Sequence, residues 1–226
     1  MPTETLRPSA AGDAAGLTPS GAAANWDCVD EASADDETTY VRTNGLVSDV
    51  ADYYNLGASG LTSETIGSID VQARVTTSDG TPDANSNSQI GVRLAGTNSL
   101  GTKISVFDIG AGNNVWVTYE ESALARPGGG AWTVADLADL QVAVLLSEGS
   151  AGPNVRCTQI FVEVNYTPGR GGGGGGGKGG GGGQGGGGGP PGGGGPPGQG
   201  GGGPPGQLRR TIIGSRRPRR KGLIQI

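Results

Sequence analysis

Glycine dominates the chain between residues 169 and 206, where 28 of its 48 glycines lie. A segment with almost no side chains cannot build a core or a catalytic pocket, so this tract confines any folded domain to the residues beside it. We therefore expect a head over residues 1–168, a Gly/Pro-rich stalk or linker over 169–207 and a C-terminal tail over 208–226. A head of this length falls in the single-domain range and can bury about two-thirds of its unfolded surface.

Alternation of apolar and polar residues dominates the head from position 38 to position 166. Within 66–77, Ile69, Val71 and Val75 would share one face while the polar residues between them take the other, which is typical of a half-buried strand. Runs of this kind or of β-prone residues predict seven strands, at 38–43, 66–77, 88–95, 102–107, 113–120, 141–147 and 158–166.

Turn residues separate these runs at Asn44-Gly45, Asp79-Gly80, Gly110–Asn114 and Gly149–Pro153. One stretch, 133–141, predicts a short helix, in which Thr133 caps the start, Asp136 completes a weak capping box and two leucines face inward. Many short strands with frequent turns predict an all-β fold. We expect an antiparallel β-sandwich, of jelly-roll type.

Four blocks of the head resemble phage-type structural β-sandwich proteins, which are virion-associated. They are NWDCVDEASADDETTYVRT at 26–43, DYYNLG at 52–57, GGGAWTVADLADLQVAVLL at 128–146 and VRCTQIFVEVNY at 155–166. The resemblance spans nearly all of the head and none of the tail. It implies a particle component without enzymatic activity, and it supplies no catalytic residues.

The glycine tract itself has a register: every third residue from Gly171 through Gly201 is glycine. One interpretation is a collagen-like or polyproline-type stalk, whose residues would span about 100 Å when extended. The other is a flexible coil with a root-mean-square span of about 30 Å. Most of the triplets lack proline, which favours the coil for an isolated chain.

Charge is divided unevenly along the sequence. Residues 1–170 carry 21 acids and 8 bases, a net charge of −13, whereas residues 171–226 carry 8 bases and no acid. The tail joins its basic run to two β-prone apolar ends, so we expect it to dock on a sheet edge of another copy or on a particle surface, and nucleic acid is the alternative partner. The predicted docking residues are Arg216, Arg217, Arg219, Arg220, Lys221, Ile212, Ile213, Leu223, Ile224 and Ile226.

An acidic run near the start of the head raises the question of a metal. Hard cations such as calcium take six to eight oxygen ligands, so carboxylates this dense could hold one, although the run lacks the spacing of an EF-hand loop. A solvated acidic loop is the simpler interpretation, and no other cofactor is expected. The candidate calcium ligands are Asp27, Asp30, Glu31, Asp35 and Asp36.

The head has two cysteines, Cys28 and Cys157. They lie where the first and last strands of a sandwich approach one another, and a bridge closing so long a loop would stabilise the head by up to ~4–5 kcal/mol. Strict alternation, however, places Cys157 on the face opposite the one that carries Ile160 and Val162, so two free thiols are an equal alternative.

Chemistry-bearing motifs are scarce. The chain has no histidine, which removes the commonest general base and metal ligand, so we expect no enzymatic activity. The three tryptophans, Trp26, Trp116 and Trp132, could form a sugar-stacking platform, although core or strand-anchoring roles are the commoner explanation. Trp116 alternates in phase with Thr118 and could face outward as a sugar contact.

The main hypothesis from the sequence is a structural assembly protein: a virion decoration, fibre or filament subunit with an exposed β head. The alternative is a carbohydrate-binding β-sandwich module. Neither a signal peptide nor a membrane span is evident, so synthesis in the cytoplasm and release into a virion or extracellular assembly are expected.

Overall fold

A computed structural model of the protein describes residues 1–45, 47–78, 85–149 and 153–169. The chain divides into two units, Met1–Gly175 and Gly176–Ile226, and every described residue belongs to the first. The predicted docking residues of the tail, and all of the predicted stalk except Gly169, lie outside the described residues. The division into head, stalk and tail therefore stays a prediction.

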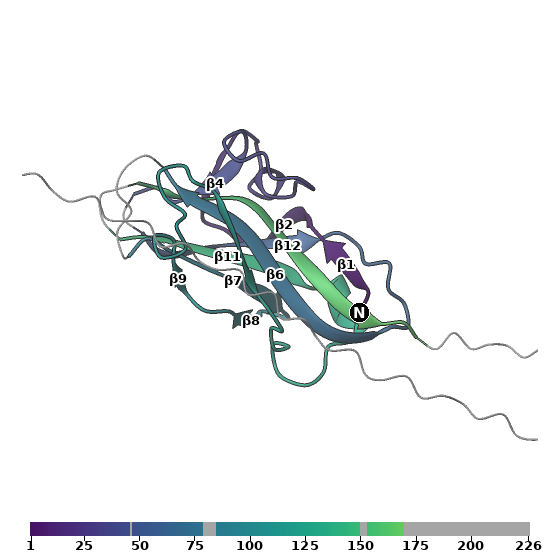
Figure 1. Ribbon diagram of the computed structural model, residues 1–226. Coiled ribbons are helices and arrows are strands. Elements are labelled where there is room, and N and C mark those ends of the chain that lie inside the picture. Colours follow the sequence, from purple (N-terminus) through teal and green to yellow (C-terminus); the bar gives the residue numbers. More distant parts are fainter. Residues whose placement is uncertain (46, 79–84, 150–152, 170–226) are drawn as a thin grey trace, which may run out of the picture. The chain divides into compact units, whose positions relative to one another are not determined.

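Two antiparallel sheets form a β-sandwich. Sheet A has the order β10 (Val117–Glu121), β6 (Thr65–Thr77), β12 (Val155–Thr167), β4 (Tyr40–Arg42) and β3 (Thr18–Ser20), with β1 (Thr3–Leu6) also paired to β12. Sheet B has the order β2 (Pro8–Ala15), β5 (Val47–Leu56), β11 (Gln141–Glu148), β7 (Asn87–Leu94) and β8 (Thr97–Leu100), with β9 (Ile104–Ser105) also paired to β7. In Figure 1, β6 and β12 cross in front of β7 and β11. The predicted all-β, jelly-roll-like sandwich is confirmed.

The core lies between the two sheets and follows the alternation in the sequence. In β6, Ile69, Val71 and Val75 are fully buried, and from sheet B Val142 and Val144 of β11 are equally inaccessible. Burying a side chain of this size contributes about 1.5–3 kcal/mol, so the inward faces of these central strands supply most of the driving force for folding.

A β-bulge in β12 reverses the alternation at Cys157. The register pairs Cys157 with Val75 and Gln159 with Arg74, and it shifts between these two pairs. Cys157 therefore points into the core, and the prediction that it faces away from the Ile160 side was wrong, because one extra residue in the strand turns the next side chain to the other face. Both Cys28 and Cys157 are free thiols with no exposed surface.

Other local predictions differ from the structure in length. β9 and β10 are shorter than the predicted strands. The N-terminal strands β1, β2 and β3 were not predicted, because β1 has only four residues and β2 and β3 consist mostly of small residues, whose pattern gives no alternation signal. The predicted short helix is present as the 3-10 helix η2 (Val134–Ala138), with a complete capping box between Thr133 and Asp136. A second 3-10 helix, η1, spans Trp26–Cys28. Within the described ranges, no helix is long and apolar enough to span a membrane.

Candidate functional site

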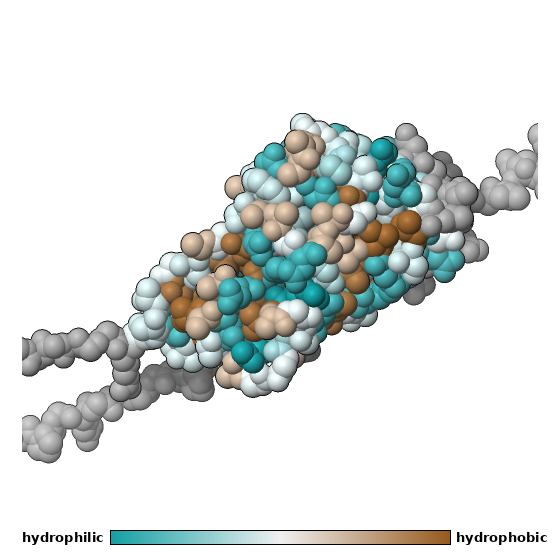
Figure 2. Space-filling view, turned by 180° about the vertical axis from the view of Figure 1, so that it is seen from behind, coloured by the Kyte–Doolittle hydropathy of each residue, from teal (hydrophilic) through white to brown (hydrophobic). Residues whose placement is uncertain are grey.

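Polar side chains gather on the outer face of sheet B. The register of β11 places Gln141 opposite both Asn55 of β5 and Arg93 of β7, so these three side chains lie side by side across three strands. Because β7 and β11 lie behind β6 and β12 in Figure 1, Figure 2 views the molecule from this side, and hydrophilic residues gather near the middle of that view.

A local departure from regular pairing brings a fourth polar residue, Asp13, onto this face. The register of β2 against β5 shifts between Ala11 and Ala15. Gly12 packs so tightly here that a Cβ atom would lie 2.6 Å from the Tyr53 carbonyl oxygen and 2.9 Å from Gln141 Oε1. Only glycine fits this approach, because contacts under 3.0 Å to backbone atoms would force the strand away.

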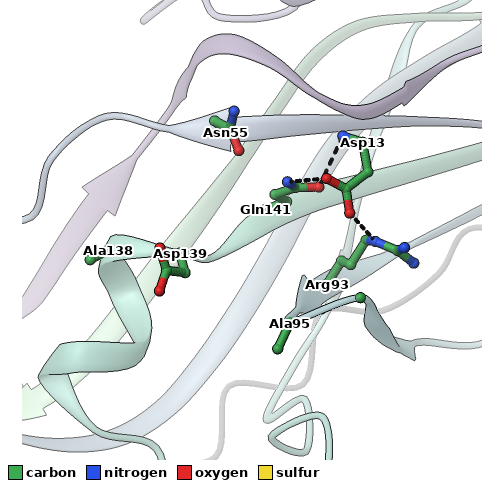
Figure 3. A pocket seen from close by; sticks show the side chains of 8 residues that line it. Asp13, Asn55, Arg93, Ala95, Ala138, Asp139 and Gln141 are labelled. Atoms are coloured by element: carbon green, nitrogen blue, oxygen red, sulfur yellow. Dashed lines mark hydrogen bonds and ion pairs between the residues drawn. The ribbon is translucent and has the colours of Figure 1, made fainter.

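Asp13 is held by two neighbours. Arg93 Nε donates a hydrogen bond to its Oδ2 at 2.7 Å, and Gln141 Nε2 donates to its Oδ1 at 3.0 Å (Figure 3). The Asp13 backbone N–H donates in return to Gln141 Oε1 at 3.3 Å. The hydrogen bond from Arg93, followed by that from Gln141, lowers the pKa of Asp13, so its carboxylate stays charged at neutral pH.

Arg93 is fixed from its other side as well. Its guanidinium carbon lies 4.7 Å from the centre of the Tyr53 ring, and its Nη1 donates to Asn98 Oδ1 at 2.9 Å. Asn98 in turn donates to the Tyr53 hydroxyl at 3.0 Å. The guanidinium group is therefore oriented before any ligand arrives.

These residues line an open pocket of about 460 Å³. One wall is the β7–β8 turn, where Ala95 and Gly96 both have positive φ, at 49° and 80°. Another wall is the end of η2, formed by Ala138 and Asp139, both of which are exposed. The full lining is Asp13, Asn55, Arg93, Ala95, Gly96, Ala138, Asp139 and Gln141.

Three polar groups in the lining remain available to a ligand. They are the Asp139 carboxylate, Arg93 Nη2 and Asn55 Oδ1, none of which makes a hydrogen bond with another described residue. One carboxylate, one guanidinium donor and one amide oxygen can serve a ligand that carries several hydroxyl groups, since each hydroxyl both donates and accepts.

The wall formed by η2 is anchored by a partly buried ion pair, between Asp136 and Arg126. Asp136 is 9% exposed and accepts hydrogen bonds from Arg126 Nη2 at 2.8 Å and Nε at 3.0 Å. The Thr133 backbone N–H and hydroxyl donate to the same carboxylate, each at 2.8 Å. Arg126 above all lowers the pKa of Asp136, to about 2, so the anchor is charged under ordinary conditions.

The predicted calcium ligands do not converge on one point. Asp36 forms an ion pair with Arg74, whereas Glu31 and Asp35 both hydrogen-bond to the Thr39 hydroxyl. Within the part of the chain that the structure describes, no group of three histidine, cysteine or acidic side chains is placed to hold a metal ion. Partial burial raises the pKa of both Asp30 and Glu31.

The tryptophans lie apart from the pocket. Trp116, the predicted sugar contact, precedes β10 of sheet A; its indole N–H donates to Glu37 Oε1 at 3.0 Å, and its ring centre lies 6.4 Å from that of Tyr40. Trp132 is buried and donates to the Leu124 carbonyl at 2.9 Å, and Trp26 packs partly buried against the core. The sequence did not reveal the pocket, because the residues that line it meet only through strand register and through the irregular pairing of β2 between Ala11 and Ala15.

Comparison with known proteins gives structural likeness only. No family model matches the chain, and no curated protein matches it. Among solved structures, the CBM22-1 xylan-binding domain of Paenibacillus barcinonensis Xyn10C aligns at a TM-score of 0.37 with 8% identity, over 67% of this chain and 82% of that one. A carbohydrate-binding module of Cellvibrio mixtus lichenase 5A, solved with cellotriose, aligns at 0.35 with 14% identity, over 73% and 98%. The C-terminal domain of EclA, described as a sugar-binding protein, aligns at 0.33 with 14% identity, over 58% and 79%.

These matches correct the main functional hypothesis from the sequence. The three solved structures named above are described as carbohydrate- or sugar-binding domains, which agrees with the alternative hypothesis and not with a virion decoration, fibre or filament subunit. The resemblance of the four sequence blocks to phage-type proteins has no counterpart in the family or curated comparisons. At such low identities and TM-scores the likeness carries no argument about a ligand, so any such argument must come from the pocket itself.

Proposed function

We propose that the β head is a carbohydrate-binding module and that its ligand occupies the polar pocket on the outer face of sheet B. One observation carries the proposal. A preorganised network holds Arg93 in place, and it leaves Arg93 Nη2, Asn55 Oδ1 and the Asp139 carboxylate around a single open pocket.

This arrangement suits a sugar for two reasons. The Asp139 carboxylate has two oxygens free of hydrogen bonds to other described residues and can engage two neighbouring hydroxyl groups as a pair, and an ionised partner makes the hydrogen bond stronger than a neutral one does. The methyl groups of Ala95 and Ala138 line the same pocket and offer small apolar surfaces to the C–H groups of a sugar ring. The two neighbours that hold Asp13 satisfy both of its oxygens, so its role is to position Arg93.

We infer that the head binds its ligand without transforming it. Hydrolysis of a glycoside uses one carboxylic acid that carries a proton and one carboxylate. The pocket offers Asp13 and Asp139. Asp13 is ionised at neutral pH, so it holds no proton to donate, and Arg93 and Gln141 occupy its two oxygens, so it is not free to act as the second carboxylate either.

The proposal is tested by affinity electrophoresis of the full chain through gels that contain xylan, soluble cellulose, β-1,4-galactan, mannan or soluble chitin, followed by calorimetric titration with the polysaccharide that retards it. Retardation by at least one polysaccharide is expected. If none of the five slows migration and calorimetric titration with each of the five detects no heat of binding, the proposal is wrong.

Asp139→Ala is the decisive variant, because this exposed side chain makes no hydrogen bond to another described residue and its loss should not disturb the fold. A hydrogen bond from an ionised group is worth about 1.5–3 kcal/mol, so affinity should fall about tenfold or more. Asp108→Ala removes an exposed carboxylate outside the pocket and is the matched control; its affinity should equal that of the parent.

A further inference from the structure

The polar pocket has a neighbour on either side of η2. A second pocket of about 430 Å³ shares Ala138 with it and is otherwise lined by Leu56, Gly57, Ala58, Ser59, Leu61, Val134 and Leu137. A third, of about 460 Å³, shares Ala95 and Asp139 with it and is otherwise lined by Leu94, Thr97, Arg126, Pro127, Gly128, Ala135 and Asp136. The three pockets therefore adjoin one another at the C-terminal end of η2, where each flanking pocket shares lining residues with the central one.

The two flanking pockets differ in chemistry from the central one. The pocket beside Ala58 is lined mainly by apolar and backbone groups, with Ser59 as its one hydroxyl side chain. The pocket beside Ala135 contains the Arg126–Asp136 ion pair, whose carboxylate is already occupied by Arg126 and Thr133. Apart from the shared Asp139 carboxylate and the side chain of Thr97 in the third pocket, neither flank adds open polar side chains to those of the centre, so each is suited to add contact area and little anchoring.

The shared residues also fix the order of the three sites. Ala138 and Asp139 are consecutive and exposed, and together they join the central pocket to both flanks. A ligand that leaves the central pocket in either direction therefore passes over the end of η2. That end is held in place by the capping box and by the ion pair of Asp136.

We propose that the ligand is an oligosaccharide segment of at least three units, which lies across all three pockets with its middle unit on Arg93, Asn55 and Asp139. The inference rests on the proposed carbohydrate-binding function and adds the length of the ligand. Each pocket falls within the range of about 300–1,000 Å³ that is usual for a small-molecule site, so each has room for a sugar unit. A single sugar would fill only the centre and would forgo the contacts on both flanks.

The test is calorimetric titration of the full chain with a monosaccharide and with oligosaccharides of two, three and four units, all taken from the polysaccharide that retards the protein. Affinity should rise at least tenfold from one unit to three. Equal affinity for one unit and for three would overturn the three-pocket inference while the carbohydrate-binding function stands. No retardation by any of the five polysaccharides, together with no heat of binding to any of them, would overturn both.

Two variants locate the effect on the flanks. Ala58 and Ala135 are exposed residues of the outer pockets, and leucine at either position fills the pocket without adding a hydrogen-bonding group. Ala58→Leu and Ala135→Leu should each lower the affinity for the three-unit ligand at least threefold and leave that for the monosaccharide unchanged. Ala32→Leu, at an exposed alanine outside the pockets, is the control. If both flank variants bind the three-unit ligand as tightly as the control does, the inference is wrong.

Discussion

Asp52 is the buried polar residue whose replacement should most affect the head. It lies in β5, has no exposed surface and accepts four hydrogen bonds. The backbone N–H groups of Gly16 and Leu17 donate at 2.6 and 2.8 Å, Asn25 Nδ2 donates at 2.6 Å and the Tyr54 hydroxyl donates at 2.8 Å. This carboxylate therefore ties the chain after β2 to the strand that carries Tyr53 and Asn55.

Asp52→Asn keeps the shape of the side chain but leaves one acceptor oxygen for four donors. About two donors then lose their partner in the core, and each buried donor without a partner costs about 1–3 kcal/mol. We expect the free energy of unfolding to fall by about 3–5 kcal/mol, which for a domain of this size lowers the melting temperature by about 6–20 °C.

Urea and thermal denaturation of the full chain, followed by circular dichroism, measure this loss. Tyr54→Phe is the matched comparison, because it removes a single donor and keeps the ring; we expect a loss of about 1 kcal/mol. A loss below about 1 kcal/mol for Asp52→Asn would refute the reasoning, since it would mean that the four donors find other partners at little cost.

Three further predictions concern titrating groups. Burial raises the pKa of Glu31, so the contribution of this group to stability is present below pH 4.5, its unfolded pKa, and is lost as pH rises through its folded pKa. Glu31→Gln should flatten this decline of stability with pH in calorimetric scans. An unchanged dependence of stability on pH in the variant would count against the prediction. Asp136, with a pKa of about 2, has the opposite sign: its contribution is present above pH 3.8 and is lost as pH falls through about 2. Arg126→Met should therefore lower the free energy of unfolding at pH 7, and should lower it much less at pH 2, where about half of the carboxylate is protonated. Burial raises the pKa of Cys28 and raises that of Cys157 to about 12. A thiol reagent should therefore label both cysteines only in denaturant. Rapid labelling of the native protein would contradict the burial of the two thiols.

The sequence predicted the central strands because their burial is regular. In β6 every second residue from Ile69 to Val75 is buried, so alternation alone indicates which side chains face the core, whereas β11 is recognised as a continuous apolar run, most of which is buried. β5 is harder to recognise, because the inward position of Asp52 breaks the apolar pattern. The error at Cys157 has a similar cause, since a bulge between Cys157 and Gln159 depends on contacts that a single strand does not contain.

The pocket could not be predicted for a related reason. Asp13 and Arg93 are 80 residues apart and meet only because β2 departs from regular pairing at Gly12. In the sequence, Arg93 and Gln141 occupy ordinary polar positions of amphipathic strands, which normally face solvent. Conversely, Trp116 was singled out for its side-chain type, although its neighbours in space are Glu37 and Tyr40 on the sheet A side of the molecule.

The most direct measurement of the central claim is a nitrogen–proton NMR titration of the isotope-labelled full chain with the three-unit oligosaccharide. The account predicts saturable shifts at the amides of Asn55, Arg93 and Asp139, together with a shift of the Arg93 Nε–H signal, while the Trp116 indole signal stays in place. Shifts confined to the indole of Trp116 or to residues 208–226, or no shift at any concentration of the oligosaccharide, would contradict it.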